Sequence, residues 1–346
     1  MSATVWTYTA FAVVCLLLLT LPFVPAFREW LRPSDAEPLP ISASYTSDID
    51  HFAKRLHADA TAKLGQGPST GYEDFEFVNP AWAPADWGQP RKRLISTQPL
   101  DTTQAIRSTS PLYVEGSVNA GANSKFSALY ATGSIALGEH SEIQDWAHAD
   151  GLLRLTASGV ALRRVSSSTA IELGDECWFE RLQAPVMRFG SSNSHLPGPI
   201  DYPQMTASYA GLPQAVQQTP TLFLIRGDCV LPAASRYVGS LVVTGFLTIG
   251  EGTTVVGDIK ARDGISVGHL ASVEGAVTCE KRVYMFNKAR ALGPVVAEGD
   301  ILLGAHTLVG LPDAPTTLSA VNIIIESGAV VHGMIWAREI GMVKSL

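Results

Sequence analysis

The chain carries an 18-residue internal repeat, and this repeat constrains the fold more than any other feature. Four equally spaced glycines mark the period, at Gly239, Gly257, Gly275 and Gly293. When each glycine begins a turn, positions 3, 5, 9, 11, 15 and 17 of that turn hold apolar or small residues. The same frame fits turns that begin at 127, 145, 163 and 221, and the 48 residues at these positions of all eight turns include no Asp, Glu, Lys, Arg, His, Asn or Gln. Such regularity indicates a repeat architecture.

An 18-residue turn with six apolar positions divides into three short strands, one for each side of a triangular coil. Alternate side chains of a strand point to opposite faces, so two positions of each side point inward. Stacked turns about 4.8 Å apart hydrogen-bond to one another along the axis. The sequence therefore predicts an all-β fold, a triangular parallel β-helix of about ten turns, over residues 109–346. The frame breaks at 181–220 and at 310–320, where we expect insertions.

The N-terminal residues 1–30 are predicted to form a transmembrane anchor. No charged residue occurs in the segment 5–27, and about 20 apolar residues span a hydrocarbon core of roughly 30 Å. A cleaved signal peptide is the alternative, but the first residues, MSATVW, lack the positive charge that such a peptide usually carries. Arg28 and Arg32 follow the span. The positive-inside rule then predicts a single-pass protein of the bacterial inner membrane with a cytoplasmic C-terminal domain. A periplasmic domain is the other possibility.

Residues 31–108 are predicted to hold a Pro-rich spacer, an amphipathic helix and an irregular linker. The helix is expected over 47–64, because Thr46, Ser47 and Asp48 precede apolar residues at helical spacing. It would lie on the membrane surface or pack on the end of the solenoid. The segment 65–100 includes NPAWAPADWGQP and shows no periodicity, which is typical of an irregular segment.

Composition and cysteine positions argue against several kinds of site. The net charge of -7 gives no general attraction for nucleic acid. Cys15 lies in the apolar segment, and Cys177, Cys229 and Cys279 fall at inward positions with no C-x-x-C pair. We expect no disulfide framework, no structural zinc and no cofactor.

Three histidines are the residues to consider for an enzyme. His140 and His306 share one outward corner position of the repeat, and His269 lies one position earlier. A hexapeptide-type acyltransferase needs a histidine as general base near a cleft between solenoids. We interpret these histidines as solvated corner residues and predict no catalytic residues and no metal ligands, with a solenoid enzyme of acyltransferase or carbohydrate-active type as the alternative.

The longer break in the frame is the candidate binding region. Loops that leave a solenoid corner often carry the binding face. Ser, Pro and Gly residues dominate 181–220, and large side chains are spaced among them. We predict a partner-binding loop that presents Phe189, His195, Tyr202, Met205 and Tyr209.

Three stretches resemble one known family. They are IGEGTTVVGDIKARDGISVGHLASVEGAV, VVAEGDILLGAHTLVG and IIIESGAVVHGMIWA. Their G-x-[IV]-x-A and I-x-[IV]-G repeats are similar to those of the bactofilins, the polymer-forming cytoskeletal proteins of bacteria. The resemblance covers about residues 221–340 and implies a right-handed β-helix, nucleotide-free filaments, membrane association and a role in positioning envelope-building enzymes. The upstream turns and the two insertions depart from that family's pattern.

These observations together predict a scaffold. A β-helix exposes backbone groups at both ends unless they are capped, which favours end-to-end self-association. The C-terminal IGMVKSL is too short to cap the last turn well. We therefore expect a membrane-anchored, self-associating protein that binds the lipid bilayer through residues 5–27 and positions envelope or polysaccharide-synthesis proteins.

Overall fold

The computed structural model describes residues 3–24, 27, 49–65, 74–78, 92–190 and 204–345. The chain divides into two compact units, Met1–Ser47 and Asp48–Leu346. The first unit contains helix α1 (Ala3–Thr20) and the 3-10 helix η1 (Leu21–Phe23). Its stretch Val5–Phe23 is apolar and long enough to cross a bilayer, a property that membrane anchors share with signal sequences. Arg28, Arg32 and most of the spacer lie outside the described residues.

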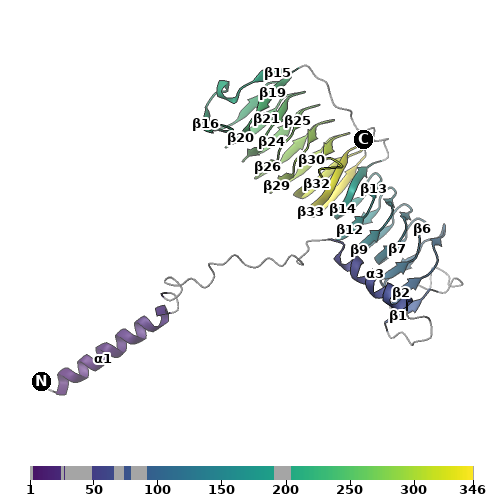
Figure 1. The fold of residues 1–346 in the computed structure, drawn as a ribbon, viewed down its shortest axis with the longest axis horizontal. Coiled ribbons are helices and arrows are strands. Elements are labelled where there is room, and N and C mark those ends of the chain that lie inside the picture. Colours follow the sequence, from purple (N-terminus) through teal and green to yellow (C-terminus); the bar gives the residue numbers. More distant parts are fainter. Residues whose placement is uncertain are drawn as a thin grey trace. The chain divides into compact units, whose positions relative to one another are not determined.

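The second unit is a parallel β-solenoid of about 14 turns, each of about 18 residues. Its 204–345 segment, which we call the C-terminal arm, stacks strands in three ladders (Figure 1). One ladder contains β17 (Leu222–Ile225), β20 (Ser240–Val243), β23 (Ile259–Ala261), β26 (Val277–Cys279) and β29 (Val295–Ala297). Another contains β18 (Cys229–Leu231), β21 (Phe246–Ile249), β24 (Gly264–Val267), β27 (Val283–Met285) and β30 (Ile301–Leu303). The third contains β15 (Met205–Ala207), β19 (Ser235–Val238), β22 (Thr254–Val256), β25 (Ser272–Val273), β28 (Arg290–Ala291) and β31 (Leu308–Val309), and the arm ends with β32 (Thr316–Glu326) and β33 (Val330–Lys344).

The 74–190 segment, which we call the N-terminal arm, has the same three ladders. The first contains β1 (Phe75–Phe77), β2 (Arg93–Ser96), β5 (Leu112–Val114), β7 (Lys125–Ala131), β9 (Glu142–Ala149), β12 (Arg164–Ser167) and β14 (Trp178–Phe189). The second contains β3 (Leu100–Asp101), β6 (Val118–Ala120), β8 (Ile135–Leu137), β10 (Leu153–Leu155) and β13 (Ala170–Leu173). The third contains β4 (Arg107–Ser108) and β11 (Val160–Ala161), and it also includes parts of β7, β9 and β14.

The solenoid begins before residue 109, so the predicted boundary and the estimate of about ten turns are both wrong. Leu94 and Ile106 are buried in an earlier turn that contains β2, β3 and β4. Leu94 pairs with Leu112, and Leu112 pairs with Leu129, so the second of these turns is shorter than the first by a single position. This deletion hides the earlier turns from a search at a fixed period. The NPAWAPADWGQP stretch lies outside the described residues.

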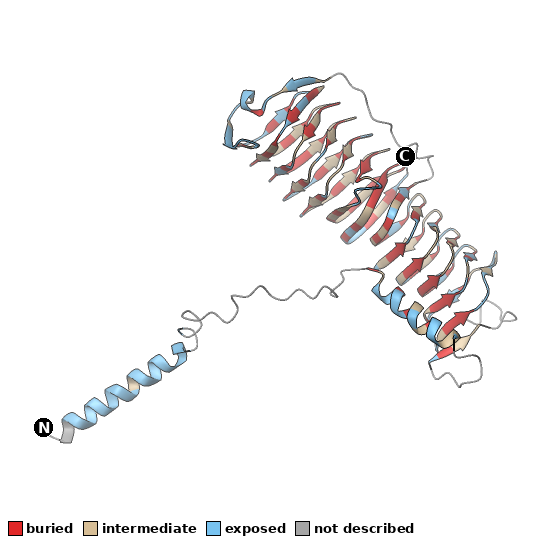
Figure 2. Cartoon of the chain, viewed as in Figure 1, coloured by how far each residue is buried: buried red, intermediate tan, exposed pale blue. Residues whose placement is uncertain are grey.

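The predicted inward positions form the core. All 48 of them are buried, and Leu241, Ile259, Val277 and Val295 are examples from one ladder. Along the strands of both arms, buried residues alternate with intermediate and exposed ones (Figure 2). One continuous hydrophobic cluster runs through both arms. The alternation of side chains along each short strand thus accounts for the core.

The two arms meet through their last strands, which pair in antiparallel orientation. After β14 the chain resumes at β15, at the far end of the other arm, and its turns run back toward β14 (Figure 1). Phe179 pairs with Gly341, Leu182 with Ile335 and Met187 with Val331, which are pairs on three sides of the coil. We call this contact between β14 and β33 the junction. It joins two solenoids of opposite direction into one core.

The junction corrects two expectations from the sequence. Residues 181–189, which the sequence assigns to an insertion, belong to β14. The C-terminal IGMVKSL is not a poor cap at a free end, because β33 extends to Lys344 and pairs with β14. A repeat pattern gives the spacing of turns but no information on the direction in which a second arm is stacked. The 310–320 insertion is also shorter than predicted, since β32 begins at Thr316.

A separate segment covers the outer end of the C-terminal arm. It contains β15, the 3-10 helix η3 (Tyr209–Gly211) and β16 (Ala215–Thr219), which pairs antiparallel with β17. Tyr209 is 1% exposed and stacks on Tyr237 with ring centroids 4.8 Å apart. Its hydroxyl donates to the carbonyl of Gly239 at 3.3 Å. This tyrosine therefore closes the core at that end.

The predicted amphipathic helix is confirmed as α3 (His51–Leu64). It packs on a side of the N-terminal arm and not on an end. Ala53, Leu56 and Ala60 form a second small core with outward side chains of the first ladder, among them Tyr113 and Tyr130. Its outer face is exposed (Figure 2). The apolar residues at helical spacing are therefore explained by packing on the solenoid.

We predict that the junction has no room for a side chain at Gly341. A Cβ at this position would overlap the Phe179 ring, so Gly341→Ala should lower the free energy of unfolding by about 1–3 kcal/mol through overpacking. Chemical denaturation measures the change. Gly211→Ala is the matched control, because a Cβ there meets no atom within 4 Å and should change stability by less than about 0.5 kcal/mol. Equal midpoints for the two variants would contradict the packing described.

Candidate functional site

A groove of about 670 Å³ crosses the junction beside Asp50, the residue that precedes α3. Its walls come from three places: the start of α3, the N-terminal arm and the C-terminal arm. The lining residues are Asp50, His148, Ser166, Ser167, Ser168, Gln183, Ala184, Pro185, Pro312, Pro315, Thr316, Thr317, Gly333 and Met334. The groove therefore exists only when both arms and the helix are in place.

One outward column of the first ladder leads into this groove. Leu129 and Ala131 point inward, so Tyr130 between them points outward. The register aligns Tyr130 with His148, His148 with Ser166 and Ser166 with Gln183. Helix α3 covers the Tyr130 end of this column, and the next residues, His148, Ser166 and Gln183, line the groove.

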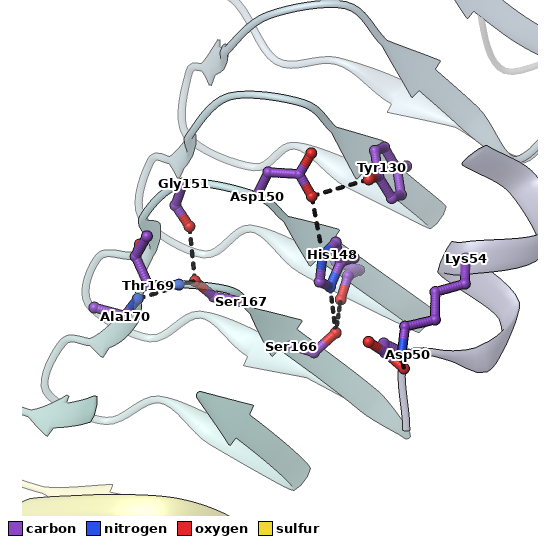
Figure 3. Close-up of polar contacts among 11 residues, drawn as sticks. Asp50, Lys54, Tyr130, His148, Asp150, Gly151, Ser166, Ser167, Thr169 and Ala170 are labelled. Carbon is purple, nitrogen blue, oxygen red and sulfur yellow. Dashed lines mark hydrogen bonds and ion pairs between the residues drawn. The ribbon is translucent and has the colours of Figure 1, made fainter. Parts of the chain in front are cut away.

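Four residues at this place form a chain of hydrogen bonds, which we call the relay (Figure 3). The Tyr130 hydroxyl donates to Asp150 Oδ1 at 2.9 Å, and His148 Nε2 lies 3.2 Å from the same oxygen. His148 Nδ1 lies 2.8 Å from Ser166 Oγ. A carboxylate only accepts hydrogen bonds, so Nε2 carries the proton of the neutral ring. The bare Nδ1 then accepts from the Ser166 hydroxyl.

Burial sets the charge of the relay. The His148 side chain is 9% exposed, and desolvation lowers its pKa, an effect that the carboxylates of Asp150 and Asp50 oppose. Desolvation also raises the pKa of Tyr130, and its hydrogen bond with Asp150 adds to the rise. At neutral pH the imidazole is thus uncharged and the phenol stays protonated. The relay holds one negative charge, on Asp150.

The neighbouring serines have different surroundings. Ser167 Oγ accepts from the backbone N–H groups of Thr169 and Ala170 and donates to the Gly151 carbonyl at 2.7 Å, so it stabilises a corner (Figure 3). Ser168 is exposed. Ser166 is 3% exposed, and its shortest hydrogen bond is the one to His148, since the Ala147 carbonyl lies at 3.5 Å.

The structure places three of the five residues of the predicted partner-binding loop. Phe189 is 1% exposed and packs near Phe179 in the core at the junction. Tyr209 closes the core at the outer end, and only Met205 is exposed, on β15. His195 and Tyr202 lie outside the described residues. Phe189 at the junction and Tyr209 at the outer end of the C-terminal arm thus pack in the core, and the binding role of the loop stays a prediction.

The other residues considered in the sequence occupy corners or the core. His140 and His306 have φ of 56° and 58°, the left-handed conformation of a tight corner, and they belong to different arms. Cys177, Cys229 and Cys279 are buried, and burial raises the pKa of Cys177 and of Cys229 to about 11, which makes them poor nucleophiles. Within the described ranges, no group of three His, Cys, Asp or Glu residues is placed to hold a metal ion.

The relay cannot be found from the inward positions of the repeat, because its residues occupy outward positions. The available pattern is an outward column of Tyr113, Tyr130, His148 and Ser166, each one turn after the residue before it. Three successive aromatic or imidazole side chains on an outer face are unusual for a solvated surface, and an amphipathic helix precedes them in the sequence. These two features together point to a covered face.

No protein-family model, curated protein sequence or solved structure matches the chain. The established features are the β-solenoid and the N-terminal apolar helix.

We predict that His148 makes stability depend on pH. Its pKa is lowered on folding, so between the folded value and the unfolded value of about 6.5 the unfolded chain binds the extra proton. Stability should be full above about pH 6.5 and should fall as the pH drops through the folded pKa. Denaturation at pH 7.5 and pH 5 should show a smaller loss for His148→Gln than for the wild type. His140→Asn, at an exposed corner that tolerates Asn, should keep the wild-type loss, and an unchanged loss in His148→Gln would refute the prediction.

Proposed function

We propose that this chain is a membrane-tethered, bactofilin-like scaffold that self-associates and positions envelope or polysaccharide-synthesis proteins. The observation that carries the proposal is the continuous pairing of strands in the Asp48–Leu346 unit, from β1 through the junction to β16. Neighbouring turns share backbone hydrogen bonds along both arms, which makes the unit rigid. A rigid body attached to an apolar helix suits the task of holding partners at fixed positions.

The apolar helix α1 supports the membrane part of the proposal. The Thr9 and Thr20 hydroxyls donate to the carbonyls of Val5 and Leu16 at 2.8 Å, so these polar groups are satisfied within the helix. We place the protein in the bacterial inner membrane as a single-pass protein with a cytoplasmic solenoid. In this proposal, residues 5–27 are the segment that binds the lipid bilayer.

The anchor predicts a retained N-terminus. Intact mass measured on protein from the membrane fraction should include residues 1–24, and alkaline carbonate should not extract it. A reporter that is active only in the cytoplasm should be active when it is fused after Leu346. A mature chain that begins after the apolar helix would show a signal peptide, and a reporter active only outside the cytoplasm would reverse the orientation.

Self-association has to use the outer ends of the solenoid. The last turn, which the sequence predicts to be a free end, pairs with β14. In the described part of the chain, β1 pairs only with β2 and β16 pairs only with β17, so each leaves one edge of backbone groups open. Val216 on β16 is 50% exposed, and Gln217 and Gln218 beside it are also exposed. An open strand edge is a template for pairing with another chain.

We predict that a charge on β16 reduces self-association. The Asp48–Leu346 unit has its own core, so it can be purified without the anchor and tested by sedimentation and electron microscopy without nucleotide. It should form oligomers or filaments, and Val216→Lys should shift them toward monomers. Val238→Lys is the control, because Val238 is 63% exposed on β19, which pairs with β15 on one side and β22 on the other. A strict monomer at high concentration would refute the self-association part of the proposal.

A further inference from the structure

We propose that Ser166, His148 and Asp150 form a nucleophile site in the junction groove that cleaves uncharged acyl esters. This activity goes beyond the scaffold and does not depend on it. In this site Ser166 is the nucleophile, His148 is the general base, and Asp150 is a positioning residue that acts through His148.

The geometry meets the requirements of an activated serine. The nucleophile and the base are 2.8 Å apart, and the base lies 3.2 Å from the carboxylate that orients it. Both distances fall within the range expected of a serine, its base and the orienting group. Asp150 also accepts the Tyr130 hydroxyl at 2.9 Å, which holds its oxygen in place. The proton on Nε2 leaves Nδ1 free to take the serine proton.

The groove gives the substrate space and selects its charge. A volume of about 670 Å³ lies within the usual range for small-molecule sites. Ala184, Pro185 and Met334 offer apolar surface for an acyl chain. The lining residues include one carboxylate, Asp50, and neither Lys nor Arg. An anionic ester would therefore be disfavoured, and an uncharged ester fits best.

The reaction balances as an ordinary ester hydrolysis. Ser166 Oγ bonds to the carbonyl carbon of the ester while its proton passes to His148 Nδ1. The bond from that carbon to the alcohol oxygen breaks, and the alcohol takes the proton from Nδ1. A water molecule then attacks the acyl-serine, gives its proton to Nδ1, and releases the carboxylic acid as Ser166 regains its hydrogen. Asp150 stabilises the imidazolium that forms in each step.

The burial of Ser166 makes the site depend on the junction. One side of Ser166 packs against the outward column, and the other side lines the groove, whose walls come from both arms. Only a chain with a formed junction would present this serine to a substrate. The same burial keeps His148 neutral and ready to accept a proton at neutral pH, while Asp150, Asp50, Lys54 and Tyr130 are the titratable groups that face it.

An uncharged fluorophosphonate probe tests the proposal on the full-length chain. The wild type should form an adduct on Ser166, identified by peptide mass spectrometry, and Ser166→Ala should form none there. His148→Gln should slow the labelling by 100-fold or more, because a general base typically contributes about 10²–10⁴ in rate. Ser266→Ala, on β24 and outside the groove, should label like the wild type. A folded wild-type chain without an adduct on Ser166, or with equal labelling in His148→Gln, would overturn the proposal.

A pH profile separates positioning from a purely structural role. The labelling rate should rise as His148 loses its proton, with a midpoint below the ordinary histidine pKa of about 6.5. Asp150→Asn should lower the plateau of this profile, since an amide no longer fixes the proton on Nε2. Hydrolysis of an uncharged nitrophenyl butyrate by the wild type should follow the same profile. A variant that loses labelling but keeps its membrane attachment and its oligomers leaves the scaffold proposal intact, and the reverse result leaves the nucleophile site intact.

Discussion

The antiparallel pairing of β14 with β33 is the interaction on which the rest of the structure depends. Each arm of the solenoid ends in a turn whose backbone groups and core side chains would otherwise face water. Pairing the two last strands satisfies both ends at once, on three sides of the coil. Leu182 and Ile335 are both fully buried there, so the cores of the arms become one. The chain thus contains an end-to-end contact of two solenoid arms within one molecule.

The junction also shapes the surface. It brings Gln183 of one arm beside Met334 of the other, and both line the groove. Helix α3 covers the outward tyrosines of the same column and leaves His148 and Ser166 beyond it. The relay therefore lies where three segments that are far apart in the sequence meet. The inner ends of the two arms pair with each other, so an end-to-end contact with another molecule would have to use the outer ends.

The sequence predicts the parts of this fold that depend on local alternation. A buried side chain at every second position of a short strand produces an alternating apolar pattern in the sequence, and all 48 predicted inward positions are buried. Helix α3 is readable for the same reason, from Ile49, Ala53 and Leu56. The direction of the second arm does not depend on local sequence, so Phe189 and Tyr209 resemble loop residues in the sequence although both are buried in the core. The relay depends on contacts between turns and on the covering helix. The local sequence around Ser166 therefore does not predict it.

The antiparallel register of the junction is the central claim, and a pair of engineered cysteines tests it most directly. Gln183 and Met334 are paired across β14 and β33, so Gln183→Cys with Met334→Cys should form a disulfide under mild oxidation, seen as a linked peptide by mass spectrometry. Gln183→Cys with Trp336→Cys is displaced along β33 to the next position on the same face and should not form one. A linked peptide in the displaced pair, or none in the aligned pair, would contradict the account.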